Sequence, residues 1–210
     1  MRTALAYASA FGVTATCVAL LPQARRTAWL GHLSTNLDNL ADHPLRALVG
    51  SAFVTDGNDQ LAWTALALVG LGAAGQALGD LRLAGLLAST HVLATVVSET
   101  VLAVQVRVGA VPASARSVLD VGPSYVVAPA LVLGVALGST RGRVGAGLGF
   151  AVLAPHLFGG LARLDVAAVG HVVAIATALL AGPALVRDQR SRWGLPGRVT
   201  IEGNRVTRST

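Results

Sequence analysis

The chain has 210 residues, of which 53% are hydrophobic and only 12% are charged, about half the charged fraction of a typical soluble domain. Its net charge is +6, and every basic residue is an arginine in a short polar stretch or in the C-terminal tail. This distribution is typical of topology signals in membrane proteins and argues against a nucleic-acid-binding surface. Cys17 is the only cysteine, which excludes an intramolecular disulfide and a cysteine-based metal site.

Six apolar stretches are long enough to cross a bilayer, because a helical span needs roughly 20 residues. A helix also satisfies its backbone hydrogen bonds within one segment, as lipid requires. We therefore predict an all-α membrane protein with one six-helix domain, residues 1–187, and a flexible polar tail, residues 188–210. The predicted spans are residues 3–21, 60–79, 83–106, 119–138, 144–162 and 166–186.

The first stretch has features of both a retained span and a signal peptide, since Arg2 precedes it. No small-residue cleavage site occurs before "QARR", so we interpret it as a retained helix. The long outer loop, residues 22–59, follows. Its leucines are spaced as one apolar stripe on a helix, at Leu30, Leu33, Leu37 and Leu40. Two placements fit this helix: flat in the membrane interface, or as a cap on the bundle.

The arginines also predict the orientation of the helices. With a cytoplasmic N-terminus, Arg141, Arg143 and the arginines of the tail all lie on the cytoplasmic side, whereas the outer loops hold most of the aspartates. Because arginine is enriched in cytoplasmic loops, we expect a multi-pass protein of the cell membrane with both termini in the cytoplasm.

Two polar side chains fall at the same expected depth. Ser124, in "DVGPSYVVAP", lies about five residues into the fourth span, and His171 about five residues into the sixth, so both are roughly 7 to 8 Å below the outer edge. A neutral imidazole can remove the proton of a serine hydroxyl and return one to a leaving amine. The pair is therefore a candidate catalytic dyad. The alternative is structural, with the serine bonded to its own helix and the histidine bridging two helices.

Three stretches resemble the rhomboid family of intramembrane serine proteases. "GPSY", residues 122–125, is similar to the family's Gly-x-Ser-Gly, and "GHVVAIATALLAG", residues 170–182, is similar to its sixth helix. "PLRALVGSAFVTDGNDQLAWTALAL", residues 44–68, is similar to the beginning of the family's second helix. The resemblance covers about residues 44–182 and is nearest to a divergent rhomboid-like group of high-GC bacteria. It implies a rhomboid-like bundle.

The resemblance implies roles for single residues. Ser124 would be the nucleophile and His171 the general base, with no cofactor. The backbone N–H of Ser124 would donate to the oxyanion. Gln60 and Thr64 stand where the family has a histidine and an asparagine, so the resemblance gives them the supporting role at the oxyanion.

The residues flanking the serine complete the implied site. Gly122 begins the motif, and Tyr125 stands where the family has a glycine that lets a neighbouring helix approach. The tyrosine side chain either brings a hydroxyl to the site or fills the pocket. The implied function is cleavage of single-span membrane proteins near the outer leaflet. The alternative is an inactive rhomboid-like protein that binds membrane proteins without cutting them.

The third predicted span carries His91, Thr95 and Ser98 on one face, with Glu99 beside them. An ionisable side chain inside a membrane is a candidate functional residue. It fits either the ion path of a small transporter or a hydrogen-bond network between helices. Neither an internal repeat nor a pair of broken half-spans is visible, which favours the network. No metal-ligand spacing occurs within a span.

Overall fold

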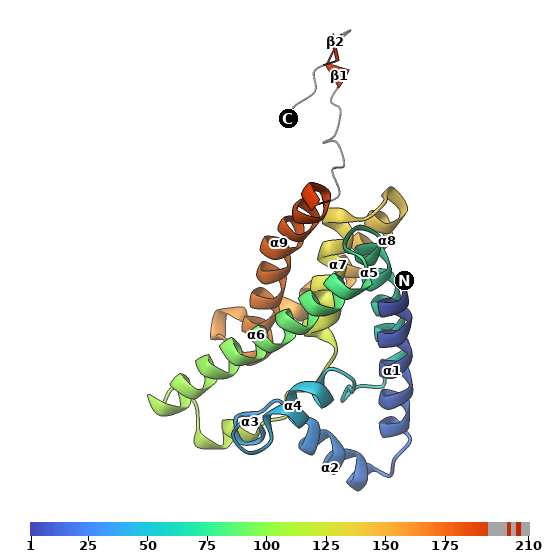
Figure 1. Cartoon of the computed structure of the whole chain (residues 1–210). Coiled ribbons are helices and arrows are strands. Elements are labelled where there is room, and N and C mark those ends of the chain that lie inside the picture. Colours follow the sequence, from blue (N-terminus) through green and yellow to red (C-terminus); the bar gives the residue numbers. More distant parts are fainter. Residues whose placement is uncertain (193–200, 203–204, 207–210) are drawn as a thin grey trace.

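The computed structural model describes residues 1–192, 201–202 and 205–206. Its described part is helical, apart from a two-residue antiparallel pairing of β1 (Ile201–Glu202) with β2 (Arg205–Val206). Each of the six predicted apolar stretches forms a helix (Figure 1). These helices are α1 (Arg2–Ala19), α5 (Gln60–Leu78), α6 (Asp80–Arg107), α7 (Ser124–Leu137), α8 (Thr140–Phe158) and α9 (Val166–Arg192).

The prediction of six spans is supported only in part. Four helices are long and apolar enough to cross a membrane by themselves: α5, α6, α8 with its extension to Arg163, and α9 up to Asp188. α7 is apolar but has only 14 residues, and the 18 residues of α1 include Arg2 and Tyr7. The architecture is thus that of an all-helical, multi-pass membrane protein with four self-sufficient candidate spans in the described chain.

The fourth apolar stretch becomes helical five residues later than predicted, at Ser124 rather than at residue 119. The residues just before Ser124 are hydrogen-bonded to other segments of the chain. The carbonyl of Asp120 accepts from the backbone N–H of Thr35 at 2.9 Å, and the N–H of Gly122 donates to the carbonyl of Ser51 at 3.0 Å. Pro123 has no N–H to offer. These pairings hold the segment out of the helix.

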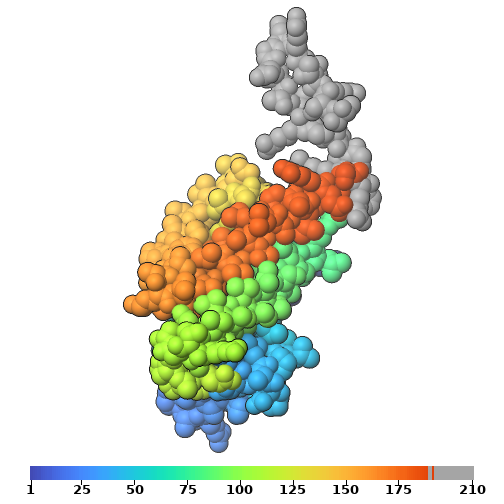
Figure 2. Space-filling view, turned by 90° about the vertical axis from the view of Figure 1, so that its left-hand side faces the viewer, coloured from blue at the N-terminus to red at the C-terminus, as the bar shows by residue number. Residues whose placement is uncertain are grey.

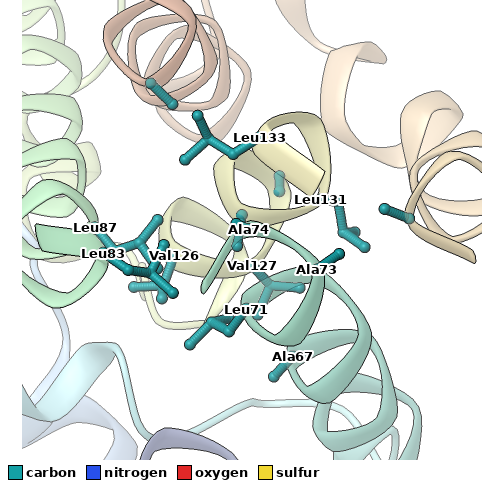
Figure 3. Packing of buried hydrophobic residues seen from close by; sticks show 14 of the residues in the cluster. Ala67, Leu71, Ala73, Ala74, Leu83, Leu87, Val126, Val127, Leu131 and Leu133 are labelled. Carbon is teal, nitrogen blue, oxygen red and sulfur yellow. The ribbon is translucent and has the colours of Figure 1, made fainter. Parts of the chain in front are cut away.

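The short helix α7 lies at the centre of the bundle and packs against α5, α6, α8 and α9. Its residues form much of the main hydrophobic core (Figure 3). Val126 lies beside Leu83 and Leu87 of α6, and Val127 lies beside Leu71 of α5. A central helix of this kind must be apolar on all sides, which explains why its sequence resembles that of a membrane span.

Glycines set the spacing around α7. A Cβ at Gly70 of α5 would lie 3.0 Å from the backbone nitrogen of Leu131. A Cβ at Gly134 of α7 would lie 2.8 Å from the Cβ of Ala146 and 3.0 Å from that of Ala73. Helices in lipid associate mainly through such close van der Waals contact, because no hydrophobic force distinguishes their neighbours from lipid.

The predicted amphipathic helix of the outer loop is interrupted. The loop forms three short helices: α2 (Gln23–Leu33), α3 (Leu37–Asp42) and α4 (Pro44–Ser51). α3 starts anew because the side chain of Asn36 accepts from the N–H of Asn39 at 2.9 Å, an N-cap. The three helices lie together at one end of the bundle (Figure 1), with Ser34 and Thr35 buried. This arrangement favours the cap over the interfacial placement.

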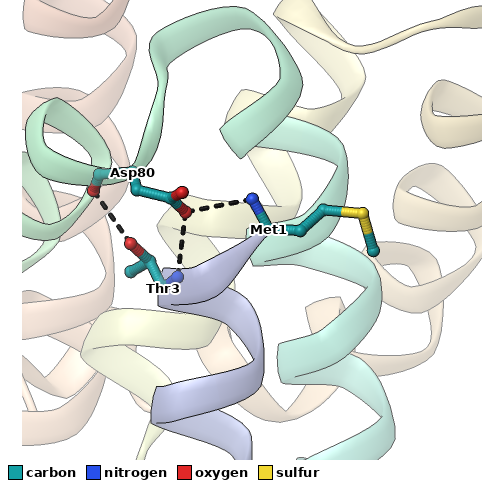
Figure 4. A network of polar contacts seen from close by, with 3 residues as sticks. All are labelled: Met1, Thr3 and Asp80. Carbon is teal, nitrogen blue, oxygen red and sulfur yellow. Dashed lines mark hydrogen bonds and ion pairs between the residues drawn. The ribbon is translucent and has the colours of Figure 1, made fainter.

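At the opposite end, α1 is fastened to α6 through Asp80 (Figure 4). One carboxylate oxygen accepts from the N-terminal ammonium of Met1 at 3.0 Å and from the N–H of Thr3 at 2.9 Å. The Thr3 hydroxyl donates to the Asp80 carbonyl at 2.9 Å. An acidic side chain in the first turn of α6 is also favoured by the helix dipole.

α6 and α9 lie side by side along one face of the bundle (Figure 2). α9 continues to Arg192, so the first residues of the predicted tail, 188–210, belong to this helix. The remainder of that tail prediction falls on 193–200, 203–204 and 207–210, which lie outside the described residues, and on the short β pairing.

Gly134→Ala should lower the free energy of unfolding by about 1–3 kcal/mol, because the added methyl group overpacks the contact with Ala146 and Ala73. Gly72→Ala is the matched control, since a Cβ there meets no atom within 4 Å. It should be neutral or stabilising by up to about 1 kcal/mol. Reversible unfolding in mixed detergent micelles measures both. If Gly134→Ala and Gly72→Ala lower the free energy of unfolding equally, close contact at Gly134 does not hold α7 in place.

Candidate active site

Ser124 and His171, which lie 47 positions apart in sequence, meet where α7 and α9 pack together. The Ser124 Oγ is 2.8 Å from the His171 Nε2, a hydrogen-bond distance. Ser124 is the first residue of α7, and His171 lies in the second turn of α9. The imidazole is 5% exposed and Ser124 is partly exposed, so the hydrogen bond is partly shielded from bulk solvent.

The tautomer of His171 follows from its other nitrogen. Nδ1 lies 2.9 Å from the backbone carbonyl oxygen of Leu157, and a carbonyl only accepts, so Nδ1 carries the hydrogen. Nε2 then has a free lone pair and accepts the Ser124 hydroxyl. Leu157 lies in the last turn of α8, where carbonyls have no partner within the helix. The end of α8 therefore fixes the histidine in the form that a general base requires.

The start of α7 supplies two backbone donors beside the serine. The N–H groups of Val126 and Val127 both donate to the carbonyl of Pro123, at 3.0 and 2.8 Å. Within the described residues, the N–H groups of Ser124 and Tyr125 donate to no backbone acceptor. Free amides at a helix N-terminus carry partial positive charge and suit a developing oxyanion.

Gly122 shapes the turn that precedes the serine. Its φ is +149°, a backbone conformation that favours glycine. Its N–H donates to the Ser51 carbonyl, which fastens the turn to the end of α4. This role agrees with its place in the motif and concerns the backbone, because glycine has no side chain to offer.

Tyr125 is 4% exposed and packs between two imidazoles. Its ring makes an edge contact with His171, with centroids 5.2 Å apart at 78°, and a tilted contact with His91 at 6.1 Å. The hydroxyl donates to the Val166 carbonyl at 3.2 Å. Of the two alternatives from the sequence, the structure favours the filling one, because the hydroxyl is engaged with α9.

A hollow of about 10 Å³ adjoins the serine, which is enough for about one water molecule. No sequence pattern predicts that its lining residues meet, although Asp120 and His91 are polar residues in apolar surroundings. The lining residues are Thr35, Ser51, His91, Asp120, Val121, Gly122, Ser124 and Tyr125.

The structure does not bring Gln60 or Thr64 to this hollow. The Thr64 hydroxyl donates to the Gln60 carbonyl at 2.7 Å, a bond within its own helix. It also faces α1, since a Cβ at Gly12 would lie 3.3 Å from it. The supporting role implied for these two residues therefore has no geometric basis here, and the amides of α7 are the nearer donors.

Asp120 connects the hollow to the outer loop. Its Oδ2 accepts from the Thr35 hydroxyl at 3.0 Å, and its N–H donates to the Ser34 hydroxyl at 2.9 Å. Burial raises the pKa of the Asp120 carboxyl, and the Thr35 hydrogen bond partly opposes this shift. The carboxyl is thus easier to protonate in the folded protein than in the unfolded chain.

His91, Thr95, Ser98 and Glu99 of α6 are all buried. In the described part of the chain, the Thr95 Oγ1 and the Glu99 Oε2 have no hydrogen-bond partner, and the Ser98 hydroxyl donates to the Thr95 carbonyl of its own helix, so of these four residues only His91 bonds to another helix. His91 bridges α6 to α4, with its Nε2 2.8 Å from the Leu48 carbonyl. Glu99 lines neither the hollow at Ser124 nor the larger apolar groove of about 260 Å³ between α1, α4 and α6. Among the described residues, no group of three His, Cys, Asp or Glu side chains is arranged to hold a metal.

A family model described as "Rhomboid-like protein" matches residues 3–192. The match extends from α1 to α9 and includes both Ser124 and His171. No curated protein and no solved structure gives a significant match to the chain.

Asp120→Asn should make stability less dependent on pH. Because the folded pKa of Asp120 is raised, its stabilising contribution is present at low pH and is lost as pH rises through the folded pKa. Asparagine stays neutral and keeps an oxygen that accepts from Thr35. The melting temperature of the variant should therefore exceed that of the wild type at high pH and converge with it at low pH. Thr35→Val, the control, should steepen the dependence, and parallel profiles of Asp120→Asn and wild type would contradict the assignment.

Proposed function

Because the chain belongs to the rhomboid-like protein family, we propose that it is an intramembrane serine endopeptidase that cleaves single-span membrane proteins near the outer leaflet. The observation that carries this proposal is the 2.8 Å hydrogen bond between Ser124 and a His171 held in the Nδ1–H tautomer. Ser124 is the nucleophile, and His171 is the general base.

The reaction proceeds through an acyl-enzyme. The Ser124 Oγ forms a bond to the substrate carbonyl carbon while its proton passes to the His171 Nε2. The oxyanion accepts from the N–H groups of Ser124 and Tyr125, and the imidazolium then gives its proton to the departing amine as the C–N bond breaks. In the second half, His171 removes a proton from water as the water oxygen attacks the ester carbonyl. The ester C–O bond then breaks, and His171 returns the proton to the Ser124 Oγ, which releases the acid and restores the dyad.

The Leu157 carbonyl takes the orienting place that a carboxylate has in a catalytic triad. It holds Nδ1–H and accepts from it in both protonation states of the ring. A neutral carbonyl stabilises the imidazolium less than a carboxylate does. In a shielded site this interaction is stronger than it would be in water, so a dyad can function with the carbonyl alone. The orienting group comes from backbone, so no substitution of a side chain at position 157 removes it directly.

We infer that α1 and α7 complete a bundle of six spans with both termini in the cytoplasm of the cell. α7 is about 21 Å long, which is less than the hydrocarbon thickness of about 30 Å. It packs against α5, α6, α8 and α9, and non-helical backbone is tolerated at membrane depth when protein buries it. The arginine distribution then puts Ser124 in the outer half of the membrane.

A second candidate function rests on the size of the hollow. At about 10 Å³ it does not admit a peptide carbonyl unless Tyr125 or the loop around Asp120 moves. A protein that kept this closed arrangement would bind single-span membrane proteins without cleaving them. Under this alternative, Ser124 and His171 would serve only as a hydrogen bond between α7 and α9.

A fluorophosphonate probe should label the detergent-solubilised protein at Ser124. Labelling should vanish in Ser124→Ala and fall by about 1,000-fold or more in His171→Asn, because the hydroxyl loses its base. Ser89→Ala is the matched serine control, since that exposed hydroxyl is bonded within its own helix to Gly85, and it should label like the wild type.

Cleavage is measured in liposomes with a fusion protein whose single span is preceded by an outer segment of small residues. The wild type should release the outer fragment, and Ser124→Ala should not. If the wild type remains unlabelled under conditions that label a serine rhomboid protease, and both forms retain the fusion protein equally, the non-catalytic binder is correct.

A further inference from the structure

Tyr125 and Gly170 face each other across the contact between α7 and α9. Tyr125 directly follows the serine of the dyad, and Gly170 directly precedes the histidine. A Cβ at position 170 would overlap the Tyr125 hydroxyl and lie 2.6 Å from the ring carbon Cε1. Gly170 has ordinary helical backbone, so glycine is needed there for space and not for its conformational freedom.

The tyrosine has little freedom to move away. Its hydroxyl is bonded to the Val166 carbonyl at the start of α9. Its ring lies in a buried cluster with Ala94 and Ala174 and touches the imidazoles of His91 and His171. Any residue larger than glycine at position 170 must therefore displace the ring that borders the histidine.

The same ring restricts the imidazole of His171. Rotation of that imidazole about its χ2 would move Nε2 away from Ser124, and the edge contact with Tyr125, at 5.2 Å and 78°, opposes this rotation. The Leu157 carbonyl holds the other side of the imidazole. Together these contacts leave one orientation in which Nε2 points at the serine.

We propose that Tyr125 is the positioning residue for His171 and that Gly170 is its obligatory partner. The motif Gly-x-Ser-Gly has a glycine after the serine, on α7. In this chain the bulky residue is on α7 and the glycine is on α9, so the close approach of the two helices is retained with the partners exchanged. The catalytic importance of the pair rests on the proposed function of Ser124 and His171. The coupling between Tyr125, Gly170 and the orientation of His171 does not rest on it.

The pair predicts strong non-additivity in a double-mutant cycle. Gly170→Ala should reduce the rate of fluorophosphonate labelling by about 100-fold, because it displaces Tyr125 and with it the histidine. Tyr125→Gly should reduce the rate by about 10-fold through the loss of positioning. In the Tyr125→Gly background, Gly170→Ala should cost no more than about 3-fold, because there is no ring left to displace.

Tyr125→Phe separates the ring from its hydroxyl. The ring still borders the imidazole, and only the bond to Val166 is lost, so labelling should stay within about 5-fold of the wild type. This conservative rescue distinguishes positioning by the ring from a direct chemical role of the hydroxyl.

A second measurement, which does not depend on activity, is the ¹⁵N NMR spectrum of the ring nitrogens of His171. Their signals are identified by their absence from the spectrum of His171→Asn. The wild type should give one Nδ1–H tautomer, and Gly170→Ala and Tyr125→Gly should each give a mixture. Gly182→Ala is the matched control on α9, because its Cβ would meet Leu133 away from the site. It should lower stability yet leave the His171 signal unchanged.

Two results would overturn the inference: equal costs of Gly170→Ala with and without Tyr125, or a mixture of tautomers in Gly182→Ala as large as that in Gly170→Ala. If the wild type is never labelled, but its His171 shows the single tautomer and this tautomer is lost in both Gly170→Ala and Tyr125→Gly, the proposed protease is refuted and the positioning pair is retained.

Discussion

The arrangement depends on one constraint: the partly buried backbone between Asp120 and Gly122 must find hydrogen-bond partners other than a helix. It finds them in Thr35 and Ser51, which lie far away in sequence. This pairing delays α7 until Ser124 and exposes the first amides of the helix. An unpaired buried backbone group costs about as much as a lost hydrogen bond, so the start of α7 is strongly specified.

In the proposed mechanism, helix ends provide the orienting acceptor and the oxyanion donors that side chains commonly supply. The last turn of α8 orients the histidine through the Leu157 carbonyl, and the first turn of α7 offers amides beside the serine. Both groups are left unpaired by helix geometry itself. A site built in this way needs few polar side chains, which is an advantage where each buried polar group is costly.

Close packing is what makes these helix ends meet. Gly70, Gly134 and Gly170 each leave room that the added methyl group of an alanine would overfill. The first two set the depth of α7 within the bundle, and the third admits Tyr125 beside His171. Small residues therefore influence the geometry of the site as directly as the polar residues do.

The sequence by itself determined the helical stretches and the membrane character, because composition and helical rise are local properties. It indicated Ser124 and His171 only as a candidate pair, through their equal depth and the family resemblance, and the tertiary structure decided that they meet at hydrogen-bond distance. Only the tertiary structure decided that α7 starts at Ser124, that Gln60 and Thr64 lie away from the site, and that Tyr125 packs on Gly170. These outcomes depend on which distant segment supplies each hydrogen bond or empty space. No local pattern encodes that choice, since a hydroxyl such as that of Thr64 is satisfied equally well by its own helix.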